Sequence, residues 1–149
     1  MAVVCGADDS TAQAVMRAVD SGFAEAYFVG RTAEVKQQAC VAAAPTEWVH
    51  YVDADTDEEA AAAAVRMVGK GEADVLMKGL IHTDTLLRAV LHKEWGILPR
   101  GRVLTHIAVA QMESYHKLLF FTDAAVIPYP TQEQRLQQVE YLAQMLHAF

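Results

Sequence analysis

Short, mostly apolar segments alternate with helical patterns through the first part of the chain. The apolar segments cover residues 2–5, 25–29, 48–52 and 75–77, and each is bounded by glycine or polar residues, as expected of a buried strand. Between and after them, residues 12–19, 32–41, 60–64 and 83–91 carry either apolar side chains at helical spacing or a run of alanines. This alternation predicts an α/β fold, with a mainly parallel sheet between two layers of helices.

Capping residues support the predicted helices. Thr56 with Glu59 three positions later is a capping box, in which the two side chains satisfy each other's backbone N–H groups. Thr83 is a good N-cap for the helix over 83–91 because its hydroxyl can accept from the first turn. Thr32 is expected to cap the helix over 32–41, and Pro45 marks the exit from it.

The pattern changes after residue 100. Residues 102–112 read as a long strand, 113–116 as a polar break and 118–121 as a second strand. A four-residue connection is too short for a parallel crossover, so these strands predict an antiparallel hairpin. Thr131 and Gln134 form a second capping box before the last helix. One apolar stripe runs along that helix: Leu136, Val139, Leu142, Leu146 and Phe149. We interpret residues 1–149 as a single α/β domain.

Composition and charge narrow the functional classes. The net charge of −7 argues against a nucleic-acid surface, which needs clustered lysine and arginine. The two cysteines, Cys5 and Cys40, are too few for a disulfide scaffold, so we expect reduced thiols in a cytoplasmic protein. The six histidines lack metal-ligand spacing, which gives no reason to expect a metal. No apolar run reaches membrane-spanning length, and no signal peptide is apparent.

The stretch from residue 75 to 91 is the strongest candidate for a binding site. A buried strand leads into Lys78 and Gly79, and a helix begins shortly afterwards near Thr83. Helix N-termini and free backbone N–H groups bind anions, and ligands of open α/β sheets lie at the carboxyl ends of strands. The chemistry therefore favours a phosphate or a carboxylate, with Arg88 long enough to reach it. An ordinary βα turn with a capping threonine is the alternative interpretation.

Several motifs together resemble a known family. They read VLMKG at 75–79, HTDTLLRAVL at 82–91, KEWG at 93–96, LTHIAV at 104–109 and FTDAA at 121–125. In this order they resemble the phosphate acetyl/butyryltransferase family, especially its butyryl members, and the similarity extends over nearly all of the chain. The resemblance implies exchange of an acyl group between CoA and orthophosphate, which gives acyl phosphate and free CoA. It also implies the first of two α/β domains of an isocitrate/isopropylmalate-dehydrogenase-like fold, usually as a homodimer.

The resemblance assigns substrate-binding roles but no catalytic residue. CoA would be a substrate, so no resident cofactor is expected, and the partners would be acyl-CoA, phosphate and a second copy of the chain. Arg88 matches a basic contact to CoA in the acetyl branch of the family. The candidate substrate-binding residues are Lys78, Gly79, His82, Thr83, Thr85, Arg88, Thr105, His106 and Asp123.

Length is the main departure from the family. The chain is about half as long as the family's enzymes, and the second domain with its catalytic Ser-Arg pair and aspartate is missing. We therefore expect a truncated or partial form that folds and self-associates but does not turn over. The alternatives are a dehydrogenase relative on the same fold, or a non-catalytic flavodoxin-like domain that binds CoA or a nucleotide.

Overall fold

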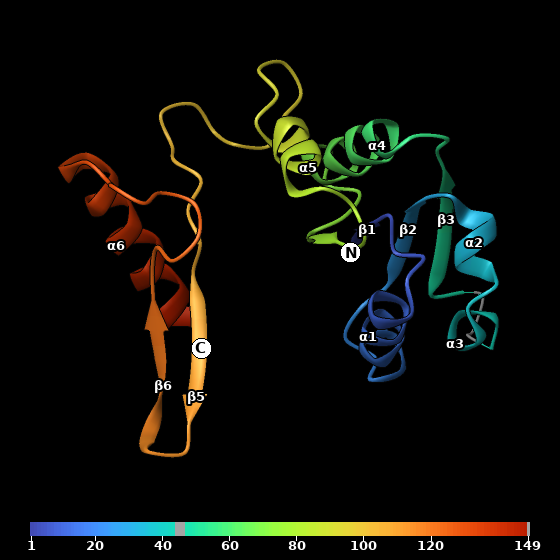
Figure 1. The fold of residues 1–149 in the computed structure, drawn as a ribbon, viewed down its shortest axis with the longest axis horizontal. Coiled ribbons are helices and arrows are strands. Elements are labelled where there is room, and N and C mark those ends of the chain that lie inside the picture. Colours follow the sequence, from blue (N-terminus) through green and yellow to red (C-terminus); the bar gives the residue numbers. More distant parts are fainter. Residues whose placement is uncertain (44–46, 149) are drawn as a thin grey trace. The chain divides into compact units, whose positions relative to one another are not determined.

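The computed structural model describes residues 1–43 and 47–148, which form two compact units, Met1–Ile97 and Leu98–Phe149. Figure 1 labels the helices and strands of both. The sequence pattern predicts one α/β domain over 1–149, whereas the structure places the parallel sheet and the hairpin in separate units. The correspondence of these residues to the first domain of a two-domain enzyme stays a prediction.

The first unit is built on a four-stranded sheet in the order β3-β2-β1-β4. All of its strand pairs are parallel, which confirms the predicted topology. β2, β3 and β4 each begin and end one residue later than the sequence pattern indicates. The elements are β1 (Ala2–Val4), α1 (Asp9–Asp20), β2 (Ala26–Gly30), α2 (Thr32–Lys36), α3 (Ala39–Ala42), β3 (Val49–Asp53), α4 (Asp57–Gly69), β4 (Leu76–Lys78) and α5 (Thr83–Val90).

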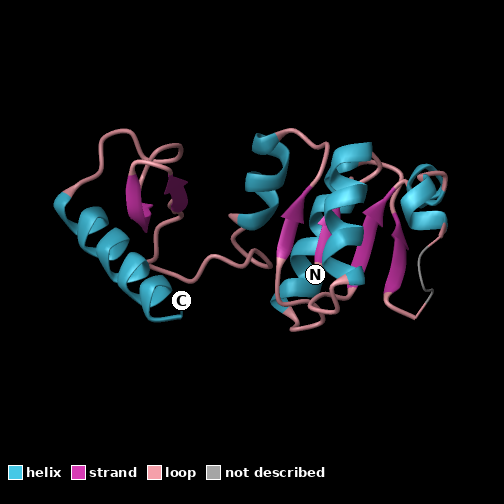
Figure 2. Ribbon diagram, turned by 90° about the horizontal axis from the view of Figure 1, so that it is seen from below, coloured by secondary structure: helices cyan, strands magenta, loops and turns pink. Residues whose placement is uncertain are grey.

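Helices cover both faces of this sheet, as the alternation of strands and helices predicts (Figure 2). Ala2 and Val4 of β1 belong to one buried cluster together with residues of α4 and α5. Val3 of β1 and Phe28 of β2 belong to a second buried cluster with residues of α1, α2 and α3. Successive side chains of a strand point to opposite faces, so the short β1 strand contributes to both cores.

The prediction of one continuous helix over 32–41 is wrong. The chain forms two short helices, α2 and α3, and Gln38 between them is extended, with ψ 124°. The amide of the Gln38 side chain donates to the carbonyl oxygen of Ala7, a tertiary contact that overrides the local helical pattern. Thr32 is the first residue of α2 and not its cap. Pro45 lies outside the described residues.

Of the two other N-caps predicted for the first unit, one is confirmed and one is wrong. The capping box of Thr56 and Glu59 is confirmed, with the Glu59 amide donating to Thr56 Oγ1 at 3.2 Å. The prediction of Thr83 as an N-cap is wrong. His82 is the extended residue before α5, and its carbonyl accepts the first helical hydrogen bond, from Leu86 N at 3.2 Å. Thr83 therefore already has a helical position and no side-chain cap is formed.

The second unit contains the predicted antiparallel hairpin, β5 (Ala108–Met112) and β6 (Tyr115–Phe121), followed by α6 (Gln132–Ala148). The turn is Glu113–Ser114, shorter than the expected break, because Tyr115 pairs with Met112. β5 also begins later than residue 102, because the backbone N–H groups of Val103 and His106 bond to side chains of Gln137 and Asp123. The capping box of Thr131 and Gln134 is confirmed.

The apolar stripe of α6 remains largely exposed. Leu136 is 66% exposed, Val139 63% and Leu146 49%, whereas the polar Gln138 is buried at 5%. Gln138 faces inward because its amide donates to Thr105 Oγ1 at 3.2 Å. Phe149, the last member of the predicted stripe, lies outside the described residues.

Candidate functional site

The Lys78–Gly79 turn lies at the carboxyl end of β4 and is hydrogen-bonded to the carboxyl end of β1. Gly79 N donates to the Val4 carbonyl oxygen at 2.8 Å, and Leu80 N donates to that of Cys5 at 2.9 Å. A Cβ on Gly79 would lie 2.5 Å from the Cys5 carbonyl oxygen, so only glycine allows this approach. The group that approaches Gly79 is therefore the β1 backbone, and these two amides are already occupied. Lys78 keeps its exposed ammonium at the turn, where it donates to the Gly79 carbonyl oxygen at 3.3 Å.

The candidate residues of α5 do not form one site. His82 and Thr83 are exposed at the N-terminal end of the helix. Thr85 and Arg88 instead face α4 and line a groove between the two helices. The Arg88 guanidinium lies 3.1 Å from Asp84 Oδ2, an exposed pair one helical turn apart. Such a pair contributes little to stability, so Arg88 is available to a ligand.

The groove between α4 and α5 has a volume of about 560 Å³. Trp95 and His92 form the aromatic part of its lining. Their rings stack, with centroids 4.0 Å apart and an interplanar angle of 17°. The Arg66 guanidinium lies 4.6 Å from the Trp95 ring centroid, in cation–π geometry. The groove thus places aromatic rings beside two cations. Its lining is Glu58, Glu59, Ala62, Ala63, Arg66, Thr85, Arg88, Ala89, His92 and Trp95.

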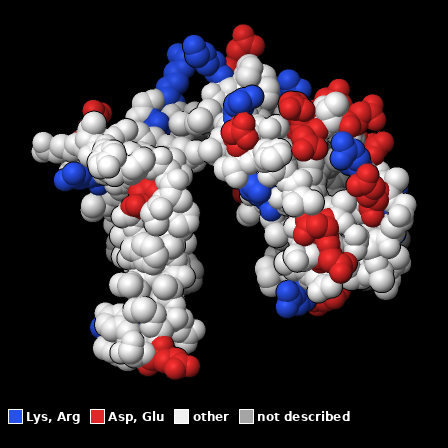
Figure 3. Space-filling model, in the orientation of Figure 1, with Lys and Arg blue, Asp and Glu red and all other residues white. Residues whose placement is uncertain are grey.

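Charges of both signs line this groove, and basic and acidic residues lie side by side over the helices of the first unit in Figure 3. Arg66 and Arg88 supply positive charge, and Glu58 and Glu59 supply negative charge. Glu59 Oε2 is engaged, since it accepts from the backbone N–H groups of Asp55 and Thr56. The groove therefore suits a ligand that carries an anionic group, which the Arg66 and Arg88 guanidinium groups can bind.

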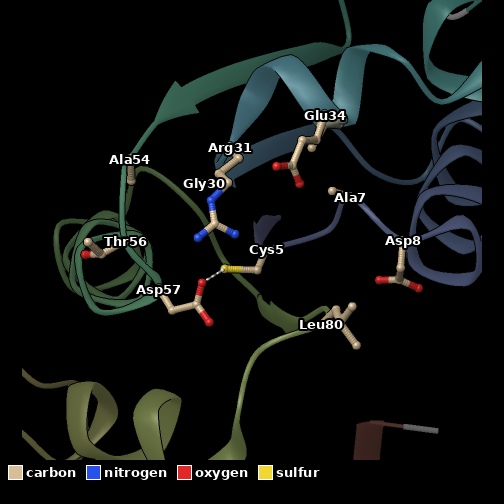
Figure 4. Close-up of a pocket in the computed structure, with 11 residues that line it drawn as sticks. Cys5, Ala7, Asp8, Gly30, Arg31, Glu34, Ala54, Thr56, Asp57 and Leu80 are labelled. Carbon is tan, nitrogen blue, oxygen red and sulfur yellow. Dashed lines mark hydrogen bonds between the residues drawn. The ribbon is translucent and has the colours of Figure 1, made fainter.

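A second cavity, of about 230 Å³, lies at the carboxyl ends of β1, β2 and β3 (Figure 4). Cys5 follows β1 there with φ 52°, and its thiol lies 3.7 Å from Asp57 Oδ1. Burial, and then the Asp57 carboxylate, raise the pKa of the Cys5 thiol to about 11. The thiol stays protonated near neutral pH, so Cys5 is not an activated nucleophile.

The three candidates of the second unit are brought together. Thr105 Oγ1 donates to Asp123 Oδ2 at 2.7 Å, and His106 N donates to the same oxygen at 3.3 Å. Backbone N–H groups of Ala125, Val126 and Ile127 also donate to the carboxylate, at 2.8, 2.8 and 3.1 Å. These hydrogen bonds hold the pKa of Asp123 well below its usual range, against an opposing effect of burial. Asp123 thus organises the loop after β6.

His106 differs from its two neighbours in this cluster. Its Nδ1 atom is buried and has no hydrogen-bond partner among the described residues. Gln138, which the sequence analysis did not single out, completes the cluster by donating to Thr105. The sequence places Gln138 on a helix whose apolar stripe is predicted to face the core. In the structure Gln138 faces the core instead and the stripe is largely exposed, so the pattern does not reveal Gln138.

Other residues missed by the sequence analysis belong to the two cavities. Arg31 and Asp57 follow the ends of β2 and β3, where ligands of parallel sheets bind, so strand order is the signal that finds them. Arg66 and His92 meet only because α4 and α5 pack together. Within the described residues, no three or more His, Cys, Asp or Glu side chains are placed to hold a metal ion. Every helix in residues 1–43 and 47–148 is too short or too polar to cross a bilayer.

Comparison with known proteins shows which family this chain resembles. The family described as "Phosphate acetyl/butaryl transferase" matches residues 54–149. Phosphate butyryltransferase of Clostridium acetobutylicum is 35% identical over 148 residues, which are 99% of this chain and 49% of that protein. Phosphate acetyltransferase of Thermotoga maritima is 30% identical over 142 residues, which are 95% and 47%.

A solved structure has the same fold. It is a branched-chain phosphotransacylase from Enterococcus faecalis V583, with a TM-score of 0.77 and 25% identity, and the match covers 99% of this chain and 51% of that one. The chain spans about half the length of the curated relatives that it matches. With the family match over 54–149 and the motif residues placed at β4, α5 and the loop after β6, the chain belongs to the phosphate acetyl/butyryltransferase family.

Proposed function

We propose that the full-length protein exchanges an acyl group between CoA and orthophosphate, and that this chain supplies part of the substrate-binding surface. The observation that carries the proposal is the groove between α4 and α5. Family motif residues Thr85 and Arg88 line it together with Arg66. CoA carries phosphates that match the two guanidinium groups.

The reaction makes defined demands on the protein. An oxygen of orthophosphate attacks the thioester carbonyl, the carbon–sulfur bond breaks, and CoA leaves as a thiolate that takes up a proton. The tetrahedral intermediate carries an oxyanion, which fixed donors must stabilise. Both substrates are anions that must be held next to each other. We assign one part of the second task, binding of the CoA phosphates, to Arg66 and Arg88.

This chain alone is proposed to bind substrate without turning it over. Cys5 carries a protonated thiol, and Asp123 already accepts five hydrogen bonds, so neither suits nucleophilic attack or proton transfer. The second candidate function, a non-catalytic domain that binds CoA, is favoured by the same observation. The two differ in whether the full-length protein is an enzyme.

The wider context is also proposed from the family. We infer that the full-length protein is a cytoplasmic homodimer of two-domain subunits, with the dehydrogenase-like arrangement and a cleft between the domains. Orthophosphate and acyl-CoA would meet in that cleft. The acyl chain is expected to be short, as the names of the butyryltransferase and acetyltransferase relatives indicate.

Two experiments test the proposal. Calorimetric titration of purified 1–149 with CoA should detect binding that Arg66→Gln weakens about tenfold, the cost of one charge-assisted contact. Arg100→Gln removes an exposed arginine outside the groove and is the control. The second experiment follows thiol release from butyryl-CoA and phosphate. The full-length protein should release thiol only with phosphate present, and the 1–149 chain should not. Phosphate-dependent turnover by 1–149 would contradict the assignment of a binding role alone.

A further inference from the structure

The cavity at the carboxyl ends of β1, β2 and β3 is separate from the groove assigned to CoA. Its lining includes Cys5, which follows β1, together with Gly30 of β2 and Asp57 of α4. It shares no lining residue with the groove between α4 and α5. The ends of parallel strands are where open α/β sheets bind ligands. Its volume of about 230 Å³ is below the range of cavities that take drug-sized molecules, so the occupant is a small metabolite.

Arg31 supplies the single positive charge of this cavity. Its guanidinium is turned toward the space beside Cys5 in Figure 4. Within residues 1–43 and 47–148, no carboxylate lies within 4.0 Å of it and it makes no hydrogen bond. A guanidinium presents five donors in a planar fork that matches a carboxylate. Arg31 is therefore free to hold the carboxylate of a ligand.

Two carboxylates share the Arg31 side of this cavity. Glu34 comes from α2 and Asp57 from the start of α4, whereas the Asp8 carboxylate, just before α1, lies across the cavity and is turned away from Arg31 (Figure 4). Asp8 Oδ1 accepts from Thr11 N at 3.0 Å, while its Oδ2 atom is buried and has no hydrogen-bond partner in the described part of the chain. The Glu34 and Asp57 carboxylates are therefore the groups that can bind a positively charged ligand group beside the guanidinium.

The combination of charges selects among ligand classes. A simple anion would pair with Arg31 but meet the Glu34 and Asp57 carboxylates, and a simple cation would pair with these carboxylates but meet Arg31. A molecule with one carboxylate and one ammonium group satisfies both sides. Of the remaining lining, Thr56 is polar, and Ala7, Val35, Ala54 and Leu80 supply apolar surface that suits a short aliphatic side chain.

We propose that this cavity binds a small aliphatic α-amino acid, with its carboxylate on Arg31 and its ammonium group between Asp57 and Glu34. The protonated thiol of Cys5 contributes to the wall of the cavity and takes no part in a reaction. None of the residues of this site lines the groove proposed for CoA.

Thermal unfolding of the purified 1–149 chain tests the proposal, because a ligand that binds only the folded state raises Tm. The probes are L-alanine, L-valine and L-leucine, compared with isovalerate and isobutylamine, which each keep one of the two charges of valine. At least one amino acid should raise Tm, and neither single-charge analogue should do so at the same concentration. No shift with any of the three amino acids, or an equal shift with either analogue, would overturn the proposal.

Two variants locate the site. Arg31→Gln and Asp57→Asn should each weaken amino-acid binding about tenfold or more by titration, as expected for loss of a charge-assisted hydrogen bond. Arg17→Gln changes an exposed arginine on α1 and should leave the affinity unchanged. Since Arg31 is exposed and unpaired among the described residues, its substitution should not unfold the protein, and CoA binding by the same variant serves as the folding control. Unchanged amino-acid affinity in Arg31→Gln would reject the site.

Discussion

Gly79 shows how one residue sets the geometry between two strand ends. Because a Cβ there would meet the carbonyl oxygens of Cys5 at 2.5 Å and Val4 at 2.7 Å, Gly79→Ala must push β1 and β4 apart. We expect a loss of roughly 1–3 kcal/mol in the free energy of unfolding, the usual cost of overpacking. Urea denaturation measures it. Gly69→Ala is the control, since its Cβ would meet only Ile97 Cγ2 at 3.5 Å, and it should not destabilise.

Asp123 predicts an acid-sensitive second unit. Its pKa is lowered in the folded state, so its contribution to stability is present above the unfolded pKa of about 4 and is lost as pH falls toward the lower folded value. Asp123→Asn should therefore be less stable than the wild type at neutral pH, and the difference should shrink as the pH falls below about 4. Unfolding free energies across this pH range measure the effect. Glu113→Gln removes an exposed carboxylate from the same unit and is the control; an equal pH response in both variants would contradict the role of Asp123.

At the scale of elements, the N-termini of α4 and α5 can be compared, because a threonine lies at each. Thr56 accepts from Glu59 N in a complete capping box, whereas Thr83 forms no cap. Thr56→Ala should lower the free energy of unfolding by about 1 kcal/mol, and Thr83→Ala should be nearly neutral. Chemical denaturation of the two variants compares them directly. A larger loss in Thr83→Ala would show that Thr83 caps the helix, as the sequence pattern alone predicts.

The groove between α4 and α5 gives a prediction for the acyl transfer proposed above. If Arg88 binds a phosphate of CoA far from the reacting carbonyl, it contributes equally before and during the reaction. Arg88→Ala should then raise KM for acyl-CoA about tenfold with a smaller change in kcat. Steady-state kinetics with varied acyl-CoA measure both. Asp84→Asn, which frees Arg88 from its exposed partner, should not raise KM; a fall in kcat alone for Arg88→Ala would place Arg88 at the chemistry instead.

Sequence reasoning succeeds for elements where local pattern and tertiary structure agree. The apolar runs of the parallel strands predict the sheet to within one residue, since alternate side chains such as Val3 and Val4 find a core on each face. It fails where a distant side chain replaces a backbone partner. Gln38 breaks a helix through its bond to Ala7, and Gln137 takes up the Val103 amide that a strand would have used.

The candidate sites show the same limit. Local chemistry finds Arg88, whose surroundings come from its own helix and the one before it. It misses Arg31, because the significance of Arg31 depends on three strand ends that meet only after the strand order β3-β2-β1-β4 is known. It also treats the Gly79 amide as free for an anion, although β1 already accepts from it. Strand order and hydrogen-bond occupancy are properties of the fold and not of a local motif.

At the scale of the whole molecule, the apolar side chains of the second unit predict self-association. Leu136 and Val139 on α6 are 66% and 63% exposed, and several large apolar side chains of the β5–β6 hairpin are also exposed. Apolar surface of this extent favours association with another protein surface. We therefore expect 1–149 to form dimers or larger assemblies whose population rises with concentration.

Sedimentation of the double variant Leu136→Gln with Val139→Gln tests which surface is responsible. Glutamine keeps a good helix propensity, so α6 should remain intact while the apolar area that drives association is removed. The double variant should sediment closer to the monomer than the wild type at equal concentration. Leu80→Gln is the control, because Leu80 is 76% exposed but lies in the first unit. If the wild type is monomeric at all concentrations, the surface of α6 is not self-complementary; if the double variant associates as the wild type does, another surface of the chain forms the contact.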